Sequence, residues 1–531
     1  MMNKRLVVWL PLLLSLALAL GIQFGLLISG SRPSLFSSGP PSIVDEVIGY
    51  INDRYVDTVN VQQMEQQSVA LVLHRLDPFS TFIPAQELTR VQEEMEGMFE
   101  GIGIEFFLVH DTVMVISVIG GGPAERAGLQ AGDQIITIND SLFSGTGITD
   151  WDVVRRLRGR KGTRVKLGIR RPGLDELMQV TIERGKIPMN SIDAAYLMDA
   201  QTGFIRISRF SENTHREFVK ALEQLQQEGM KQLILDLRQN GGGLLLQATE
   251  LADEFLDERK LIVYTQGRNH PRTDYRCRQQ GLFEQGKLVV LVDEGSASAS
   301  EIVAGAIQDW DRGLLVGRRT FGKGLVQEQL RLSDGSALRL TIARYYTPSG
   351  RSIQKPYRPV QPGDTTAQLT DSVDAAAPSF HTANGRIVYG GGGILPDVIV
   401  EHDTSQRNNR FLNQVLAAGL IPQFAYSYFQ KNKSSLETYR SPEDFRKRFE
   451  VSSSQYDEFV AYAKGKIPQA DVEQIRKARE DITHRIKAFI ARELFSSSAY
   501  FAVLNDRDAV VQQAWTLIND DSSFSAANLR R

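Results

Sequence analysis

The chain has 531 residues, a net charge of −2 and a single cysteine, Cys277. Its length exceeds what one hydrophobic core normally holds, so three or four domains are expected. The near-neutral charge argues against a nucleic-acid partner, one cysteine excludes an internal disulfide, and the seven histidines lack metal-ligand spacing. No metal or other cofactor is therefore expected.

The N-terminus contains an apolar run. After Lys4 and Arg5, residues 6–28 carry no charge, and a run of that length can span a bilayer of about 30 Å. The preceding positive charges favour a cytoplasmic N-terminus and export of the rest of the chain. We predict that residues 1–30 form a membrane anchor. A cleavable signal sequence is the alternative, because residues 17–19 (Ala-Leu-Ala) resemble a small-x-small cleavage site.

Two domains are predicted next. Residues 42–96 form an N-terminal helical segment, interrupted by a turn at 77–82. Residues 97–186 alternate short β-rich runs with Gly and Pro, which indicates a compact β domain. This domain resembles a PDZ domain in the run Pro123-Ala124-x-x-Ala127-Gly128-Leu129-x-x-Gly132-Asp133. A plain β-sandwich with glycine turns is the alternative.

The PDZ resemblance implies a peptide-binding role. Residues 151–157 would form the groove helix, and the carboxylate-binding loop would consist of Gly101, Ile102, Gly103 and Ile104. Such domains add a peptide strand to an open sheet edge and hold its terminal carboxylate on backbone N–H groups. The expected partners are therefore proteins or peptides with free C-termini.

A glycine-rich turn follows the first strongly apolar strand of the next region. Residues 231–238 are typical of a buried strand, and Gly241–Gly243 follow it closely. Glycines let backbone N–H groups approach a ligand, as an oxyanion donor must. The same turn also serves simply to close a strand-to-helix connection, so by itself it does not indicate a site.

Ser298 lies at a second strand-to-helix turn. Residues 287–293 are typical of a buried strand, and helical spacing follows over 301–310. A serine at a helix N-terminus lies where unpaired N–H groups and the dipole favour an oxyanion. Because Ser298-x-x-Glu301 is also a capping box, this serine alone does not establish catalysis.

Lys323 is flanked by glycines, which leave room around its ammonium group. If this stretch is extended, Lys323 and Gln327 share a face, so Gln327 can orient the lysine. A lysine base must lose its proton near neutral pH, and burial without a carboxylate partner favours that loss. No acidic residue lies between positions 313 and 326. The alternative is a solvated surface lysine.

Together these segments resemble the carboxyl-terminal processing (tail-specific) serine proteases. The resemblance covers roughly residues 45–405 and rests on four ordered motifs: Asp236-Leu237-Arg238-x-Asn240-x-Gly242-Gly243, Glu294-Gly295-Ser296-Ala297-Ser298-Ala299-Ser300-Glu301-Ile302, Gly322-Lys323-Gly324-x-x-Gln327 and Tyr346-Thr347-Pro348-Ser349-Gly350-Arg351. Several motifs in order are more specific than any one of them.

The resemblance assigns roles to particular residues. Ser298 would be the nucleophile, Lys323 the general base and Gln327 the residue that positions the lysine. The spacing of serine and lysine matches the family's pattern for Ser298, rather than for Ser296 or Ser300. Backbone N–H groups of Ala299 and Gly242 would bind the oxyanion, although the choice of glycine among 241–243 stays open.

One departure from the family pattern concerns the turn at 77–82. The family usually carries His where Phe79 stands. This change is expected to affect packing more than chemistry.

The resemblance also implies the architecture, a multidomain α/β fold with a crotonase-like protease core over 187–403, downstream of the PDZ domain. Alternating strand and helix patterns agree with this. Residues 355–392 interrupt the pattern and are predicted to be an inserted loop. Residues 404–531 are helical and charged, and are predicted to form an accessory domain for dimerisation or adaptor contact. A domain that only completes the fold is the alternative.

The implied function is a serine endopeptidase that recognises protein C-termini through its PDZ domain and cleaves near that end, in processing or degradation of exported proteins. Its implied location is the bacterial periplasm or cell envelope, anchored to the inner membrane. Two other classes remain as alternatives. A catalytically silent PDZ scaffold would have no reason to keep Ser298, Lys323 and Gln327 together. A crotonase-like enzyme would act on acyl-CoA, a cofactor that an exported protein would seldom meet.

Overall fold

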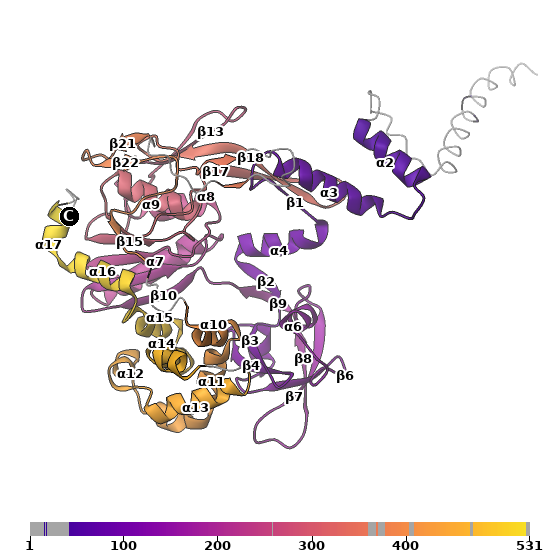
Figure 1. The fold of residues 1–531 in the computed structure, drawn as a ribbon, viewed down its shortest axis with the longest axis vertical. Coiled ribbons are helices and arrows are strands. Elements are labelled where there is room, and N and C mark those ends of the chain that lie inside the picture. Colours follow the sequence, from indigo (N-terminus) through magenta and orange to yellow (C-terminus); the bar gives the residue numbers. More distant parts are fainter. Residues whose placement is uncertain are drawn as a thin grey trace, which may run out of the picture. The chain divides into compact units, whose positions relative to one another are not determined.

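The computed structural model describes residues 15, 17, 42–257, 259–358, 368–369, 378–402, 408–467 and 471–526. The predicted anchor over residues 1–30 lies, apart from two positions, outside the described residues. Among the helices that the structure describes, none is both long and apolar enough to cross a membrane. Figure 1 gives the labels of the helices and strands used below.

The first compact unit of the chain ends at Val69. Its described part contains α2 (Ile43–Arg54) and the start of α3 (Val61–His74). Helix α2 begins after Ser42, which forms a capping box with Asp45, and this box satisfies N–H groups that would otherwise lack partners. This described part of the chain is helical.

The second compact unit begins with the end of α3 and the turn that follows it. Asp77 Oδ1 accepts hydrogen bonds from the N–H groups of Phe79 and Ser80 at 2.8 and 2.7 Å, which fixes the turn. Strand β1 (Thr81–Ile83) then pairs antiparallel with β18 (Ala337–Tyr346), and α4 (Ala85–Glu96) follows.

The predicted PDZ β domain is present as a sheet in the order β3-β4-β5-β7-β8, with β6 paired to β5. The pairs within it are antiparallel, and the apolar side chains of this sheet meet Val153 and Leu157 of α6 in one core. The flanking strands β2 and β9 pair with each other, so the chain enters and leaves the domain side by side. The bounds are β2 Met98–Gly101, β3 Ile104–Val109, β4 Thr112–Val118, α5 Pro123–Arg126, β5 Gln134–Ile138, β6 Ser141–Leu142, α6 Asp150–Leu157, β7 Arg164–Arg170, β8 Met178–Glu183 and β9 Gly185–Pro188.

A six-stranded sheet in the order β10-β11-β12-β15-β16-β23 forms the α/β core. Strand β10 is antiparallel to β11, and the other neighbours are parallel. Parallel strands need crossover connections, which contain α7, α8 and α9 in turn, whereas the connection from β16 to β23 contains strands. The bounds are β10 Ile192–Leu197, β11 Thr202–Ile207, α7 Thr214–Gln227, β12 Gln232–Asp236, α8 Leu245–Asp253, β15 Leu288–Val292, α9 Ala299–Asp309, β16 Leu314–Gly317 and β23 Val398–Ile399.

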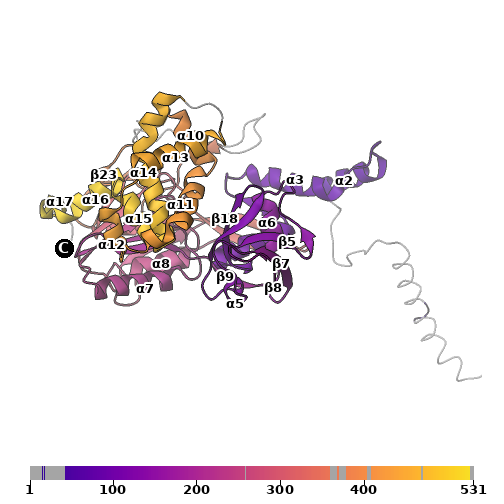
Figure 2. The ribbon, with the colours of Figure 1, turned by 90° about the horizontal axis from the view of Figure 1, so that it is seen from below.

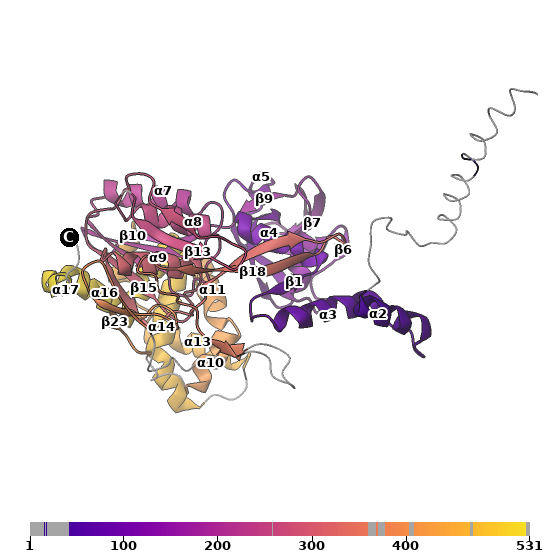
Figure 3. The same cartoon turned by 90° about the horizontal axis from the view of Figure 1, so that it is seen from above.

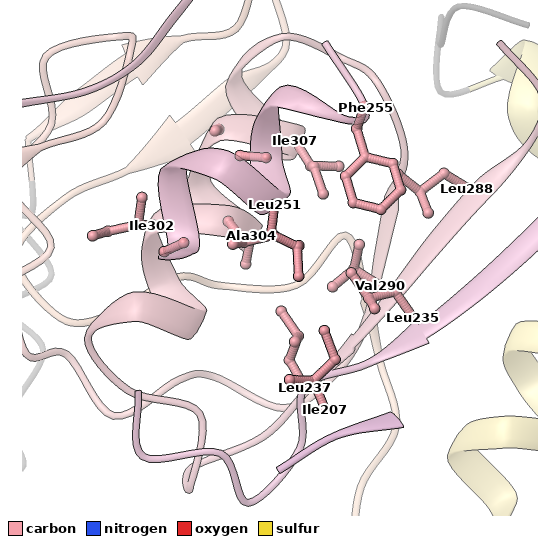
Figure 4. Packing of buried hydrophobic residues seen from close by; sticks show 14 of the residues in the cluster. Ile207, Leu235, Leu237, Leu251, Phe255, Leu288, Val290, Ile302, Ala304 and Ile307 are labelled. Carbon is pink, nitrogen blue, oxygen red and sulfur yellow. The ribbon is translucent and has the colours of Figure 1, made fainter. Parts of the chain in front are cut away.

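One face of this sheet packs against α7, α8 and α9. Figure 4 shows Ile302, Ala304 and Ile307 of α9 beside Leu251 of α8 and Phe255, facing the strand residues Leu235, Leu288 and Val290 and Leu237, which directly follows β12. All of these side chains are buried, and so is every other residue of α9. Its N-terminus is therefore held rigidly at the carboxyl end of β15.

The opposite face of the same sheet packs against the chain's last helices, α16 (Ala509–Asn519) and α17 (Asp521–Ala526). Val511, Ala514 and Ile518 of α16 share one core with strand residues Ile234, Val289, Leu291 and Val316. Burial on both faces explains why these strands are continuously apolar.

An ion-pair chain joins α16 to the motif strand β12. Asp236 is fully buried and accepts from Arg206 at 2.6 Å and from Arg238 at 2.9 Å. Arg238 also donates to both oxygens of Asp508, which caps α16 through Val510 N–H. The pairs to Arg206 and Arg238 stabilise the charge of Asp236, whose pKa lies below its ordinary value although burial opposes this.

A second sheet, in the order β1-β18-β13-β14 with β17 paired to β18, adjoins the core. Figure 3 shows β18 beside β1, two strands far apart in the sequence that the register joins at Thr81 and Arg339. The strands β17 and β18 form a long antiparallel pair, broken by a bulge between Val326 and Gln327. The bounds are β13 Leu261–Gln266, β14 Thr273–Arg276 and β17 Leu325–Arg331.

Part of the stretch predicted as an inserted loop is ordered in pairs. Strands β19 (Tyr357–Arg358) and β20 (Gln368–Leu369) pair, as do β21 (Ser379–His381) and β22 (Ile387–Tyr389). Arg386, between the last two, forms ion pairs of 2.6 and 2.7 Å with Asp311 and Asp397.

The C-terminal region is helical, as predicted, and Figure 2 shows these helices in orange and yellow. Helices α11 and α14 form its core, and two side chains contact the PDZ domain. Tyr426 donates to Val115 O at 3.2 Å, and Arg492 pairs with Glu105. The bounds are α10 Arg410–Ala417, α11 Leu420–Leu436, α12 Pro442–Arg448, α13 Ser453–Lys464, α14 Val472–Leu494 and α15 Ser497–Asn505.

Candidate active site

Ser298 occupies the turn between β15 and α9. Its backbone has φ 55° and ψ −111°, a conformation that residues with a side chain rarely adopt. The residue is half-buried and lines a cleft of about 640 Å³, together with Lys323 and the glycines 241–243. A strained turn held between a buried strand and a buried helix thus presents one hydroxyl to a cavity.

The two neighbouring serines are structural. Ser296 Oγ donates to Leu237 O at 2.8 Å, and Ser300 Oγ donates to Asn240 O at 2.9 Å. Both are fully buried, and neither lines the cleft. Of the three serines in the motif, Ser298 alone is open to a substrate.

Gly242 lies against Ser298. Its φ is 96°, and a Cβ there would come within 2.8 Å of Ser298 Cβ and 2.9 Å of Ala299 N. Only glycine fits this conformation and this space. The loop is fixed by Asn240, whose Oδ1 accepts from Gly242 N–H at 2.9 Å. That bond already uses the N–H group that the sequence analysis assigned to the oxyanion.

Lys323 and Gln327 meet, as the spacing suggested. Lys323 Nζ donates to Gln327 Oε1 at 3.0 Å. Lys323 precedes β17 rather than lying in it, and the bulge after Val326 turns the strand. Among the hydrogen bonds of the described residues, none joins Lys323 Nζ to Ser298 Oγ. The two groups share the cleft while the lysine is held by an amide oxygen.

Phe79 contributes to this arrangement directly. Its carbonyl oxygen accepts from Gln327 Nε2 at 2.6 Å, and its ring centroid lies 5.0 Å from Lys323 Nζ. The ring also makes an edge contact with Phe321. The prediction that this position affects mainly packing is therefore incomplete, because Phe79 sets both the orientation of Gln327 and the apolar surroundings of the lysine.

The pKa of Lys323 is lowered from its ordinary value. Burial is the main cause, and the charge of Arg339 acts in the same direction, while Asp77 and Glu301 oppose it. The local sequence lacks acidic residues, but the fold brings these two carboxylates near from elsewhere. Burial nevertheless prevails, which favours the neutral amine that a general base requires.

Glu301 links the two catalytic candidates. Its carboxylate is fully buried and accepts from Ser298 N–H at 2.9 Å and from Lys323 N–H at 2.9 Å. Thr320 Oγ1 and Gly322 N–H donate to it as well. Burial raises the pKa of Glu301, and these hydrogen bonds oppose the rise. One side chain therefore fixes the backbone of both the serine and the lysine.

Tyr345 makes a second link, which the sequence analysis missed. Its hydroxyl donates to Ser298 O at 3.1 Å and contacts Lys323 O. Tyr345 is fully buried, and burial raises its pKa well above the ordinary value, so it remains a neutral donor. It lies directly before the Tyr346–Arg351 motif, but nothing in its local pattern distinguishes it from a core tyrosine.

The predicted carboxylate loop of the PDZ domain, Gly101–Ile104, joins β2 to β3 and does not line the cleft. Gly103 has φ 81°, and a Cβ there would come within 2.9 Å of Ile187 Cδ1, so glycine is required. Strand β3 is at an end of its sheet. Its free edge is where a peptide strand can add.

Cys277 does not compete with Ser298 as a nucleophile. It is buried, and desolvation raises the pKa of its thiol to about 12. A thiol that stays protonated at neutral pH is a poor nucleophile.

Three stretches of the chain match known families. Residues 201–363 match peptidase family S41, and residues 114–171 match the PDZ domain. Residues 411–496 match a family of unknown function, DUF8443. The first match contains Ser298, Lys323 and Gln327, and the second contains α6.

Curated relatives are carboxy-terminal processing proteases. The protease of Bartonella bacilliformis is 35% identical over 314 residues, which cover 58% of this chain and 71% of the relative. CtpA of Bacillus subtilis is 36% identical over 52% of this chain and 59% of its own length. The Synechocystis protease is 38% identical over 52% of this chain and 66% of its own length. The chain belongs to peptidase family S41, and it is a serine-type carboxyl-terminal processing peptidase with a PDZ domain.

Solved structures include similar chains. The photosystem II D1 C-terminal processing protease is 29% identical, with a TM-score of 0.35, over 68% of this chain and 87% of that one. The PDZ domain of a Vibrio cholerae carboxy-terminal protease, solved in complex with a peptide, is 35% identical, with a TM-score of 0.16, over 17% of this chain and 97% of that one.

Proposed function

We propose that Ser298 is the nucleophile, Lys323 the general base and Gln327 the residue that positions the lysine in a serine endopeptidase. The observation that carries this proposal is that the serine and a lysine of lowered pKa line one cleft, while the lysine's hydrogen bond goes to a neutral amide. A carboxylate in place of Gln327 would instead hold the amine in its charged form.

The reaction follows from these groups. Neutral Lys323 takes the proton from Ser298 Oγ as that oxygen attacks the scissile carbonyl, and an acyl-enzyme forms. Lysine then gives the proton to the leaving amine. Water, deprotonated by the same lysine, releases the acyl group and regenerates the hydroxyl. The amide bond breaks without a cofactor.

The oxyanion would bind at the start of α9. Ala299 N–H lies at a helix N-terminus and beside Gly242, which supports it as one donor. The second donor comes from the glycine turn 241–243. Gly242 N–H serves only if its bond to Asn240 Oδ1 opens, which makes this turn the adjustable part of the site.

The PDZ domain would select substrates by their free C-terminus. Gly101–Ile104 would hold the terminal carboxylate, with the peptide added to the edge of β3. Arg158, directly after α6, pairs with Glu93 of α4 at 3.0 Å, and both line the cleft of Ser298. This pair supports a connection between the PDZ domain and the protease core.

The proposed roles of the other parts of the chain are those expected from the sequence. Residues 1–30 would anchor or export the chain. Residues 42–96 would be the helical segment, residues 97–186 the PDZ domain and residues 187–403 the crotonase-like core. The last domain would form a dimer or bind an adaptor. Exported proteins in a bacterial envelope would be the substrates, for processing or degradation.

Cleavage of matched peptides tests the proposal. Wild type, Ser298→Ala and Lys323→Ala are compared on one peptide with a free or an amidated C-terminus. Both variants should lose activity by at least about a thousandfold while still binding the free-ended peptide. Amidation should weaken binding and cleavage in the wild type. Cleavage by Ser298→Ala at the wild-type rate would contradict the assignment of the nucleophile.

A further inference from the structure

The cleft around Ser298 carries more positive than negative charge. Apart from Lys323, its lining includes four arginines and two glutamates, Arg90, Arg158, Arg209, Arg339, Glu93 and Glu94. The whole chain has a net charge of −2, so the excess is a property of the cleft. Field lines concentrate in such a cavity and raise the local concentration of anionic ligands.

Arg209 lines this cavity, and no residue that the structure describes forms an ion pair with it. It is half-buried, and its Nε is buried and makes no hydrogen bond to any residue that the structure describes. Among the described residues, its one side-chain hydrogen bond runs from Nη1 to Met189 Sδ, at 3.8 Å. A buried donor left unsatisfied costs free energy, which a bound acceptor would recover.

Arg339 lies on β18 and lines the same cleft, and its side chain forms no ion pair within the described part of the chain. Glu94, which also lines the cleft, is the carboxylate whose charge acts on Arg339. Arg339 pairs in register with Gln329 of β17, which also lines the cleft. Gln329 Oε1 is buried and lacks a hydrogen-bond partner among the described residues. Within the described residues, two strands thus present to the cavity a guanidinium outside any ion pair and an amide oxygen outside any hydrogen bond.

We propose that Arg209 and Arg339 form a carboxylate-binding subsite beside the scissile bond, so that this enzyme prefers acidic substrate segments. The inference rests on the proposed role of Ser298 and names the substrate class of that site. A guanidinium binds a carboxylate through parallel N–H donors, which adds orientation to attraction. Gln329 supplies a neighbouring polar contact.

Arg339 also acts on the base. Its charge contributes to the lowered pKa of Lys323. A substrate carboxylate on Arg339 would offset that charge, so the bound acidic substrate should need a higher pH to deprotonate the lysine than a neutral substrate does. A purely structural arginine would not produce this difference.

The test begins with wild-type enzyme digesting an unfolded protein, and mass spectrometry identifies a preferred cleavage site. Peptides spanning that site then carry Glu or Gln at successive positions on both sides, each with a free or an amidated C-terminus. In the wild type, kcat/KM should be about tenfold higher with Glu than with Gln at one position. Arg209→Gln and Arg339→Gln should bring that ratio close to one.

Controls separate this effect from misfolding. Arg344→Gln removes an exposed arginine from the same strand, outside the cleft, and should keep the wild-type ratio. Arg339→Lys keeps the charge and should retain most of the preference, even where Arg339→Gln melts at a lower temperature. Arg339→Gln should also move the acid limb of kcat/KM to higher pH.

The outcomes distinguish the two proposals. A ratio near one in the wild type, or a ratio unchanged in both Gln variants, overturns the subsite. If the preference follows the free terminus rather than a Glu side chain, the terminal carboxylate is the ligand of this subsite. If Ser298→Ala cleaves the same peptides, the proposed nucleophile is wrong, whatever the ratio.

Discussion

The charge state of Lys323 decides whether Ser298 can attack. A lysine in water is protonated at neutral pH and has no free electron pair to accept a proton. Burial and the charge of Arg339 disfavour the extra proton on this amine, and they outweigh the carboxylates of Asp77 and Glu301, which favour it. The chemistry therefore depends on the setting of one side chain.

The pH dependence of cleavage tests this setting. Because the neutral lysine is active, kcat/KM should rise with pH through the pKa of Lys323 and level off below pH 10.5, the ordinary lysine value. Phe79→Ala admits water to the ammonium, and this regained hydration should outweigh the lost attraction of the ring, so the acid limb should move to higher pH. Initial rates of peptide cleavage across the pH range give the acid limb of the wild type and of the variant. An acid limb unmoved in this variant would contradict a desolvated lysine.

Gly242→Ala tests the close approach of the glycine turn to the nucleophile. The new methyl group would lie 2.8 Å from Ser298 Cβ, on a backbone with φ 96°. Activity should fall by at least about a hundredfold, and the melting temperature should drop. Gly241→Ala is the matched control for stability, because no atom lies within 4 Å of its added Cβ. Equal melting temperatures for both variants would contradict this account.

At the level of helices and strands, the local sequence predicts much of the fold. The apolar runs of β12 and β15 and the amphipathic α7 are local patterns with a single period, so they are readable without tertiary information. The packing of α16 against the second face of the sheet was not predicted. Helix α16 lies more than two hundred residues beyond β15, and no local pattern says where its apolar face packs.

The residues of the candidate site also divide into those that the local sequence predicts and those that it does not. Ser298, Lys323 and Gln327 belong to short ordered motifs and were predicted. The role of Tyr345 and the direct contribution of Phe79 depend on hydrogen bonds between segments distant in the sequence. Glu301 was visible as a capping residue, but its bond to Lys323 N–H was not, because most of α9 and the strand β16 separate the two residues in the sequence.

Val511→Asp tests the role of α16 as part of the core. Val511 is fully buried against the sheet, so an unpaired carboxylate there should destabilise the protein by about 3 kcal/mol or more. Thr516→Asp places the same charge at an exposed position of the same helix and should have little effect. Chemical denaturation of both variants gives the comparison. Similar stability would mean that α16 is an appendage.

For the whole molecule, we expect the contact between the PDZ domain and the C-terminal helices to weaken as the pH rises. Glu493 of α14 lines a cavity together with Glu105 and residues 116–118 of the PDZ domain. Burial raises the pKa of Glu493 to about 7; Glu105 acts in the same direction and Arg492 opposes. The folded pKa is above the unfolded value, so this stabilisation is complete below about pH 4.5 and is lost as pH rises through 7.

Melting temperatures between about pH 5 and pH 8 test this contribution. Glu493→Gln removes the titration, so it should melt higher than the wild type at pH 8 and close to it at pH 5. Glu458→Gln, at an exposed position of α13, should follow the wild type at both. A fall in melting temperature from pH 5 to pH 8 that is equally large in the wild type and in Glu493→Gln would contradict the assignment of this pH dependence to Glu493.

Covalent labelling tests the proposed Ser–Lys pair most directly. The full chain is treated with a serine-directed fluorophosphonate, and mass spectrometry locates the adduct. The account predicts one adduct on Ser298, absent in Ser298→Ala and slowed by at least about a hundredfold in Lys323→Ala. Labelling at another residue, or labelling of Ser298 at the same rate without Lys323, would contradict it.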